Sequence, residues 1–115
     1  MKTIINLMMV CSFLFGTTTF AQNDFKKTET FKVYGNCEMC KSNIEGSLKK
    51  KDGIYSKHWD TNTKMITLTY DSTKITLSQI HQKIANAGYD TELAKAPDDA
   101  YGKLHSCCQY ERPKK

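Results

Sequence analysis

The alternation of apolar and polar positions predicts four short strands. The first covers residues 28–34, where apolar side chains recur with a period of two. A second and a third strand are predicted over residues 54–59 and 64–70, and the turn-forming residues 60–63 join them as a hairpin. A last short strand is expected at residues 89–93. The strands therefore fall into one leading strand, one hairpin and one closing strand.

Two amphipathic helices are predicted between these strands. Residues 38–50 place apolar side chains one helical turn apart, with lysines on much of the other face. The helix over residues 76–87 starts with a capping box, in which Thr76 is the N-cap and Gln79 follows three residues later, and it ends before Gly88. The resulting β-α-β-β-α-β order predicts an α+β, ferredoxin-like fold, with a four-stranded antiparallel sheet and two helices on one face.

Residues 1–21 have the pattern of a secretory signal peptide. A positively charged start precedes the apolar run 4–15, and Thr19 and Ala21 are the small residues expected before a cleavage site. An uncleaved anchor and a lipoprotein signal at Cys11 are the alternatives, but about 12 apolar residues are too few to span a bilayer, which needs ~20 helical residues. We expect cleavage after Ala21 and a periplasmic or secreted chain, without stable membrane insertion.

Removing 21 residues from the 115 leaves 94, which is the size of one small domain. We divide them into a flexible N-terminus (22–27), a folded domain (28–94) and a polar tail (95–115) without predicted helices or strands. The formal net charge is +5, and the basic residues are mostly dispersed, as on a solvated surface. Clustered arginines and base-stacking aromatic stripes are missing, so no nucleic-acid partner is expected.

Cysteines carry the candidate chemistry. Cys37 and Cys40 lie at the junction of the first strand and the first helix, where the helix end lowers a thiol pKa and favours the metal-ligating thiolate. Soft thiolates select Cu(I), Zn(II) and other thiophilic ions. The tail adds His105, Cys107 and Cys108 as further candidate metal ligands. They could complete the Cys37/Cys40 site, form a separate site or bridge two protomers. Cys107 and Cys108 could instead pair with Cys37 and Cys40 as disulfides, or remain a reactive pair without a ligand role.

Three stretches resemble the heavy-metal-associated domains, a family that includes soluble copper chaperones, the metal-binding domains of copper-transporting P-type ATPases and mercury-binding proteins. They read FKVYGNCEMCKSNIEGSL, DGIYSKHWD and MITLTYDSTKITLSQIHQKIANAGYD. The resemblance implies that Cys37 and Cys40 are the metal-binding pair and that Tyr89 lies on a nearby loop. One departure concerns Gly35, which stands where the family usually has a methionine that packs beneath the metal-binding loop.

Four further residues have simpler expected roles. His58 and His81 are expected at the surface, and Trp59 in the core. Lys57 occupies a strand position where an inward apolar residue would be expected.

The leading functional prediction is a non-enzymatic, exported metal-binding protein. Its cargo would be Cu(I), with Zn(II) or Hg(II) as the other candidates, held for transfer or sequestration. Its partner would be a metal-transport or efflux protein with a Cys-based acceptor site, and the chain itself a monomer or a metal-bridged dimer. The alternatives are a thiol–disulfide redox protein, since Cys-x-x-Cys at a helix start is also a redox arrangement, and an interaction module with structural cysteines.

Overall fold

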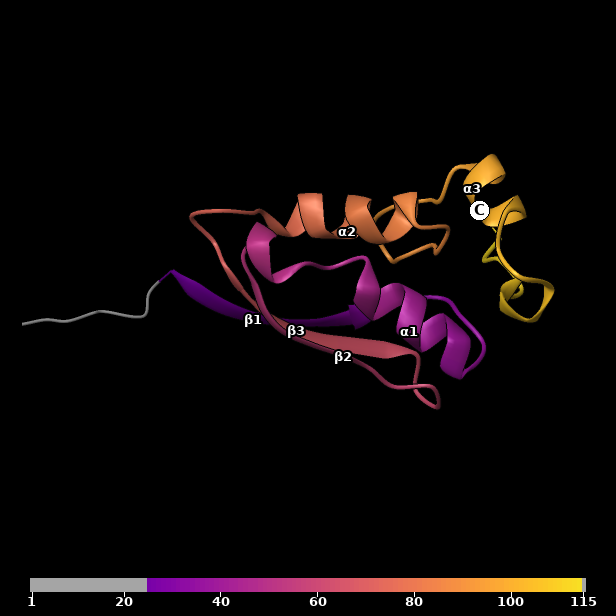
Figure 1. Cartoon of the computed structure of the whole chain (residues 1–115), viewed down its shortest axis with the longest axis horizontal. Coiled ribbons are helices and arrows are strands. Elements are labelled where there is room, and N and C mark those ends of the chain that lie inside the picture. Colours follow the sequence, from indigo (N-terminus) through magenta and orange to yellow (C-terminus); the bar gives the residue numbers. More distant parts are fainter. Residues whose placement is uncertain (1–24, 115) are drawn as a thin grey trace, which may run out of the picture.

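A three-stranded antiparallel sheet forms the base of the structure. The computed structural model describes residues 25–114; the predicted signal peptide, with Cys11, lies outside them. The strands are β1 (Lys26–Lys32), β2 (Ile54–Trp59) and β3 (Met65–Asp71), in the order β1-β3-β2 (Figure 1). Because β1 begins at Lys26, the last two residues of the segment predicted to be flexible belong to the sheet instead.

The two faces of the sheet differ in polarity. On one face, threonine hydroxyls of β1 and β3 hydrogen-bond in pairs: Thr28 with Thr69 at 2.9 Å and Thr30 with Thr67 at 3.1 Å. On the other face, the strands contribute buried side chains to the core: Phe31, Ile54, Trp59, Ile66, Leu68 and Tyr70. This apolar face needs a cover, and the helices supply it.

The helices α1 (Glu38–Gly46) and α2 (Leu77–Asn86) pack over the apolar face (Figure 1). The capping box of α2 is confirmed: the backbone N–H of Gln79 donates to Thr76 Oγ1 at 3.1 Å, and the backbone N–H of Thr76 donates to Gln79 Oε1 at 2.9 Å. Helix α1 is shorter than predicted and is followed by a 3₁₀ turn, η1 (Lys50–Asp52). Glycine has low helix propensity, and the Ser47 hydroxyl donates to the carbonyl of Ile44 at 2.6 Å, so the helix ends there.

The prediction of a fourth strand at residues 89–93 is wrong. Only one bridge, between Val33 and Thr91, joins this segment to the sheet edge within the described residues. The chain turns at once, because the Thr91 hydroxyl accepts the backbone N–H groups of Leu93 and Ala94 at 3.1 and 2.9 Å. The backbone N–H of Thr91 donates to the carbonyl of Ala94 at 2.8 Å, which closes the turn. The fold is therefore α+β with three strands and one residue pair in place of the fourth.

The segment after residue 95 is folded, although its sequence predicted no helix or strand. It contains a short helix, α3 (Asp98–Gly102), and a 3₁₀ turn, η2 (Ser106–Cys108). Tyr110 is 2% exposed; its hydroxyl accepts the backbone N–H of Asp90 at 2.8 Å and donates to the carbonyl of Gly88 at 2.9 Å. These bonds hold the segment against the loop after α2, at the end of the molecule where α1 begins (Figure 1).

An ion pair strengthens this attachment. Arg112 donates from Nε and Nη2 to the two carboxylate oxygens of Asp90, both at 2.8 Å. Burial alone would raise the pKa of Asp90, but the hydrogen bonds from Arg112 and from the backbone of Ala96 outweigh burial and lower it. The carboxylate is therefore ionised at neutral pH, as a two-point bond to a guanidinium requires.

The four residues with simpler expected roles can be compared directly with the structure. Trp59 is fully buried and His58 is exposed, both as expected. His81 is buried, because its ring stacks on Phe31 with centroids 3.8 Å apart, and the surface prediction for it is wrong. Lys57 keeps its inward position by donating to the carbonyl of Leu48 at 2.6 Å. Among residues 25–114, no helix combines the length and apolarity needed to cross a bilayer.

Candidate metal centre

The first two candidate ligands lie where β1 passes into α1. Cys37 is the N-cap residue of α1 and is partly exposed, whereas Cys40 lies in the first turn of the helix and is fully buried. Their Sγ atoms are 3.9 Å apart. Because residues three apart share a helix face, the local fold brings both sulfurs within reach of one ion.

The helix start favours the anionic form of Cys37. The backbone N–H of Cys40 lowers the pKa of the Cys37 thiol, with help from that of Met39, and the small extent of burial opposes this only in part. The backbone N–H of Asn36 also points at the neighbouring sulfur, donating to Cys40 Sγ at 3.3 Å. The loop therefore offers backbone donors to both sulfurs, which suits thiolate ligands.

The Trp59 ring supports the loop at the position where the family usually has a methionine. A Cβ added at Gly35 would lie 3.1 Å from Trp59 Cζ2 and Cη2, so the indole occupies the space beside this residue. The indole is fixed in turn, since its Nε1–H points at the carbonyls of Val33 and Lys64, at 3.0 and 3.2 Å. Glycine fits here without strain, whereas a Cβ would lie closer to the ring than ordinary van der Waals contact.

The folded tail brings a third thiol to the pair. The sulfurs of Cys37, Cys40 and Cys108 all lie within 4.8 Å of one another. Cys108 is fully buried, and burial raises the pKa of its thiol to about 12, with a further contribution from its hydrogen bond to Cys40. All three thiols are free of disulfide bonds. Three thiols thus lie close together, and they come from two segments far apart in the sequence.

The other two tail candidates lie outside this cluster. Cys107 is exposed, and its Sγ lies 4.0 Å from Cys108 Sγ and 3.7 Å from Met39 Sδ. His105 is also exposed, and its carbonyl accepts the backbone N–H of Cys108 at 2.8 Å, which closes the η2 turn. The structure therefore gives the two adjacent cysteines different surroundings: the Cys108 thiol is buried in the cluster, and the Cys107 thiol is exposed to solvent.

The sequence analysis placed Tyr89 near the thiols, but it did not identify Asn36, Asn43 or Tyr110 as their neighbours. The side chain of Asn36 donates to the carbonyl of Cys107 at 3.2 Å and so ties the metal-binding loop to the tail. The Asn43 amide donates to the hydroxyl of Tyr89 at 2.9 Å, and burial raises the pKa of that tyrosine. The Tyr89 ring stacks on Tyr110 with centroids 5.8 Å apart. In the sequence, the one signal that could have indicated this packing is the presence of two large aromatic residues, Tyr101 and Tyr110, in an otherwise polar tail.

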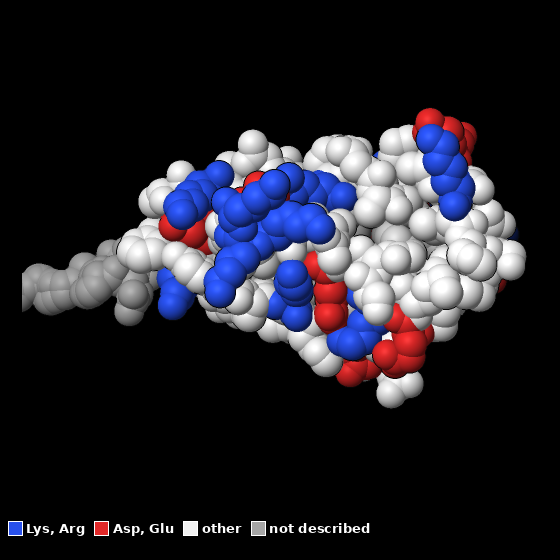
Figure 2. Space-filling model, in the orientation of Figure 1, with Lys and Arg blue, Asp and Glu red and all other residues white. Residues whose placement is uncertain are grey.

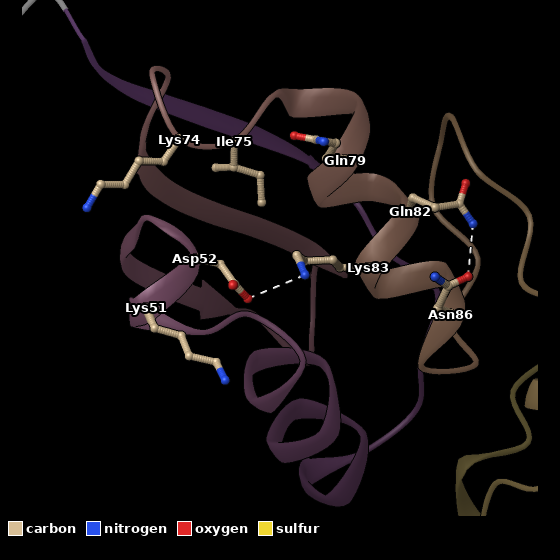
Figure 3. A pocket seen from close by; sticks show the side chains of 8 residues that line it. All are labelled: Lys51, Asp52, Lys74, Ile75, Gln79, Gln82, Lys83 and Asn86. Atoms are coloured by element: carbon tan, nitrogen blue, oxygen red, sulfur yellow. Dashed lines mark hydrogen bonds and ion pairs between the residues drawn. The ribbon is translucent and has the colours of Figure 1, made fainter.

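A lysine-rich hollow lies at the opposite end of α1 from the thiols. It has a volume of about 490 Å³, and its lining includes Lys51, Lys74 and Lys83 (Figure 3). Lys83 pairs with Asp52 at 3.3 Å across it. Figure 2 shows basic side chains gathered on this part of the surface, and they are lysines, because the one arginine of the chain, Arg112, lies in the tail. The lining contains neither cysteine nor histidine, so the hollow adds no soft ligand to the thiol cluster.

The fold and the thiol cluster together define a small α+β metal-binding domain. The family model for the heavy-metal-associated domain matches residues 30–90, more than half of the chain. The chain therefore belongs to the heavy-metal-associated domain family. The match ends at residue 90, so the tail with Cys108 lies beyond it.

Named relatives handle different metals. The copper chaperone CopZ of Staphylococcus aureus (strain MRSA252) is 33% identical over 63 residues, which cover 54% of this chain and 93% of the relative. The mercuric transport protein periplasmic component of Shewanella putrefaciens is 34% identical over 68 residues, covering 58% and 75%. A solved CopZ metallochaperone is 32% identical with a TM-score of 0.53, over 56% of this chain and 98% of that one. The resemblance to copper chaperones and mercury-binding proteins is confirmed.

Proposed function

We propose that this chain is an exported, non-enzymatic carrier that binds Cu(I) through Cys37 and Cys40 and passes it to a metal-transport protein. The observation that carries this proposal is the pair of sulfurs 3.9 Å apart at the start of α1, where backbone N–H groups lower the pKa of the Cys37 thiol. Copper is chosen because soft thiolates suit Cu(I) and because relatives include copper chaperones. Hg(II) and Zn(II) are the competing cargoes.

Transfer would proceed by ligand exchange. Cys37 is partly exposed, whereas Cys40 is fully buried, so an incoming thiolate from an acceptor reaches the ion beside Cys37. A new metal–sulfur bond to the acceptor forms as the bond to Cys37 breaks, and no electrons change hands. The partner is therefore expected to carry its own cysteine pair, as a metal-transport or efflux protein would.

A Cu(I) titration tests the proposed site. Reduced protein starting at Gln22 is titrated anaerobically in competition with a Cu(I)-chelating dye. One ion per chain is expected, together with a loss of affinity of more than about 100-fold in the Cys37→Ser/Cys40→Ser variant, since even residues that only support ligands change metal affinity 10–100-fold. Cys107→Ser is the matched control, because it removes an exposed thiol outside the cluster. Equal affinity of all three proteins would contradict the assignment.

The same preparation separates the carrier from the redox alternative. Bound Cu(I) should protect the thiols from a thiol-reactive dye, whereas a redox protein would cycle reversibly between dithiol and disulfide forms at a measurable potential. Export is tested by mass spectrometry of the protein from cells that express the full chain. A mature form beginning at Gln22 is expected, and a chain that retains Met1 would exclude the cleaved signal.

A further inference from the structure

We infer that Cys108 is a third thiolate ligand, so that the tail completes a three-sulfur site for the ion held by Cys37 and Cys40. The inference deepens the proposed function and rests on it. The family match ends at residue 90, so the third thiol is a feature of this chain rather than of the matched domain. Three thiols whose sulfurs all lie within 4.8 Å of one another are the observation that carries it.

The sulfur spacing suits one shared ion. Metal–sulfur bonds of about 2.3 Å place three sulfurs around a central ion about 4.0 Å apart in a trigonal plane. The Cys37 and Cys40 sulfurs are already 3.9 Å apart, and Cys108 Sγ is within 4.8 Å of both. Closing the remaining gap therefore requires only a small side-chain adjustment.

The tail holds Cys108 in place before any ion arrives. Tyr110, two residues further on, makes two buried hydrogen bonds to the loop after α2, and Arg112 pairs with Asp90. Asn36 bonds the carbonyl of Cys107 from the side of the metal-binding loop. A ligand that is already positioned loses little conformational freedom on binding, so it adds more affinity than a free tail would.

Three sulfurs also narrow the choice of cargo. Cu(I) accepts two or three thiolates, whereas Zn(II) in a closed site takes four ligands. Cys107 and His105 lie outside the cluster and are exposed, so the described residues offer no fourth ligand from the tail without rearrangement. Three sulfur ligands suit a soft ion of low coordination number, such as Cu(I), and the lack of a fourth ligand disfavours Zn(II).

X-ray absorption spectroscopy of the Cu(I)-loaded protein counts the sulfurs directly. Three sulfur neighbours are expected for the unaltered chain and for Cys107→Ser, and two for Cys108→Ser. These adjacent substitutions remove the same chemical group, one outside the cluster and one inside it. The affinity of Cys108→Ser for Cu(I) should fall about 10–100-fold, while that of Cys107→Ser should change by less than about threefold.

The outcomes distinguish this inference from the proposed function. Two sulfur neighbours in the unaltered chain would overturn the inference and leave the Cys37/Cys40 carrier standing, whereas no Cu(I) binding at all would overturn both. Circular dichroism of metal-free Cys108→Ser and Cys108→Ala shows whether each variant keeps its fold. If neither folds, the sulfur count of the unaltered chain decides by itself.

Discussion

Replacing Gly35 with alanine tests whether the Trp59 ring supports the metal-binding loop. The added Cβ would lie 3.1 Å from two ring carbons and 3.3 Å from Cys40 Cβ, closer than the 3.4–4 Å of ordinary contact. The ring cannot easily withdraw, since it is fully buried and its Nε1–H is bonded to the carbonyl of Val33 at 3.0 Å. Either the loop or the ring must shift by a few tenths of an ångström.

The expected loss of stability follows from two opposing contributions. Overpacking of a well-filled core costs about 1–3 kcal/mol. Alanine restricts the unfolded chain more than glycine does, which returns about 0.4–1 kcal/mol. The Gly35→Ala variant should therefore lose about 1.3 kcal/mol at the middle of these ranges and at most about 2.6 kcal/mol. Each kcal/mol lowers Tm by about 4–8 °C in a domain of this size.

Thermal and urea unfolding of the reduced, metal-free protein, followed by far-ultraviolet circular dichroism, measures this loss. Gly46→Ala is the matched control, because a Cβ at that exposed helical glycine meets nothing within 4 Å. Its stability should stay constant or rise by up to about 1 kcal/mol. In the Gly35→Ala/Trp59→Phe variant the smaller ring should leave room for the added methyl group. The double variant should therefore lose less stability than the sum of the losses in the two single variants. Wild-type stability of Gly35→Ala, with strict additivity in the double variant, would refute the reasoning.

Three other predictions concern the tail and the buried histidine. Tyr110→Phe should lose about 1–3 kcal/mol in urea unfolding, because the buried N–H of Asp90 loses its acceptor; an unchanged midpoint would contradict the role of this hydroxyl. Deleting the chain from Ala96 onward should lower Tm although the matched family region remains, since Tyr110 is part of the core; an unaltered Tm would show that the tail packs without stabilising the domain. Burial lowers the pKa of His81, so the unfolded chain takes up its proton first, and stability should fall as the pH drops below about 6.5. Unfolding at pH 7.5 and 5.5 should show this fall in the unaltered protein and a smaller one in His81→Phe; equal falls would rule out a contribution from His81.

Features that depend on neighbouring residues were predictable from the sequence. The alternation over residues 28–34 predicted β1 to within two residues, and the capping box predicted the start of α2, because both patterns depend on residues a few positions apart. The placement of Cys37 and Cys40 at a helix start is local for the same reason. The order of the first five elements and the α+β class therefore followed from the pattern alone.

Features that depend on distant contacts were decided only by the tertiary structure. Cys107 and Cys108 are indistinguishable as sequence neighbours, but the η2 turn and the anchor at Tyr110 bury one thiol beside Cys40 and leave the other exposed. His81 became a core residue because Phe31, fifty positions earlier, lies under its ring. Such contacts join residues that are far apart in the sequence, so no local pattern of apolar and polar positions can reveal them. They stabilise the protein only once the core has packed. The sequence thus determined the pair of cysteines at the helix start, and the packing of the tail decided which third thiol meets them.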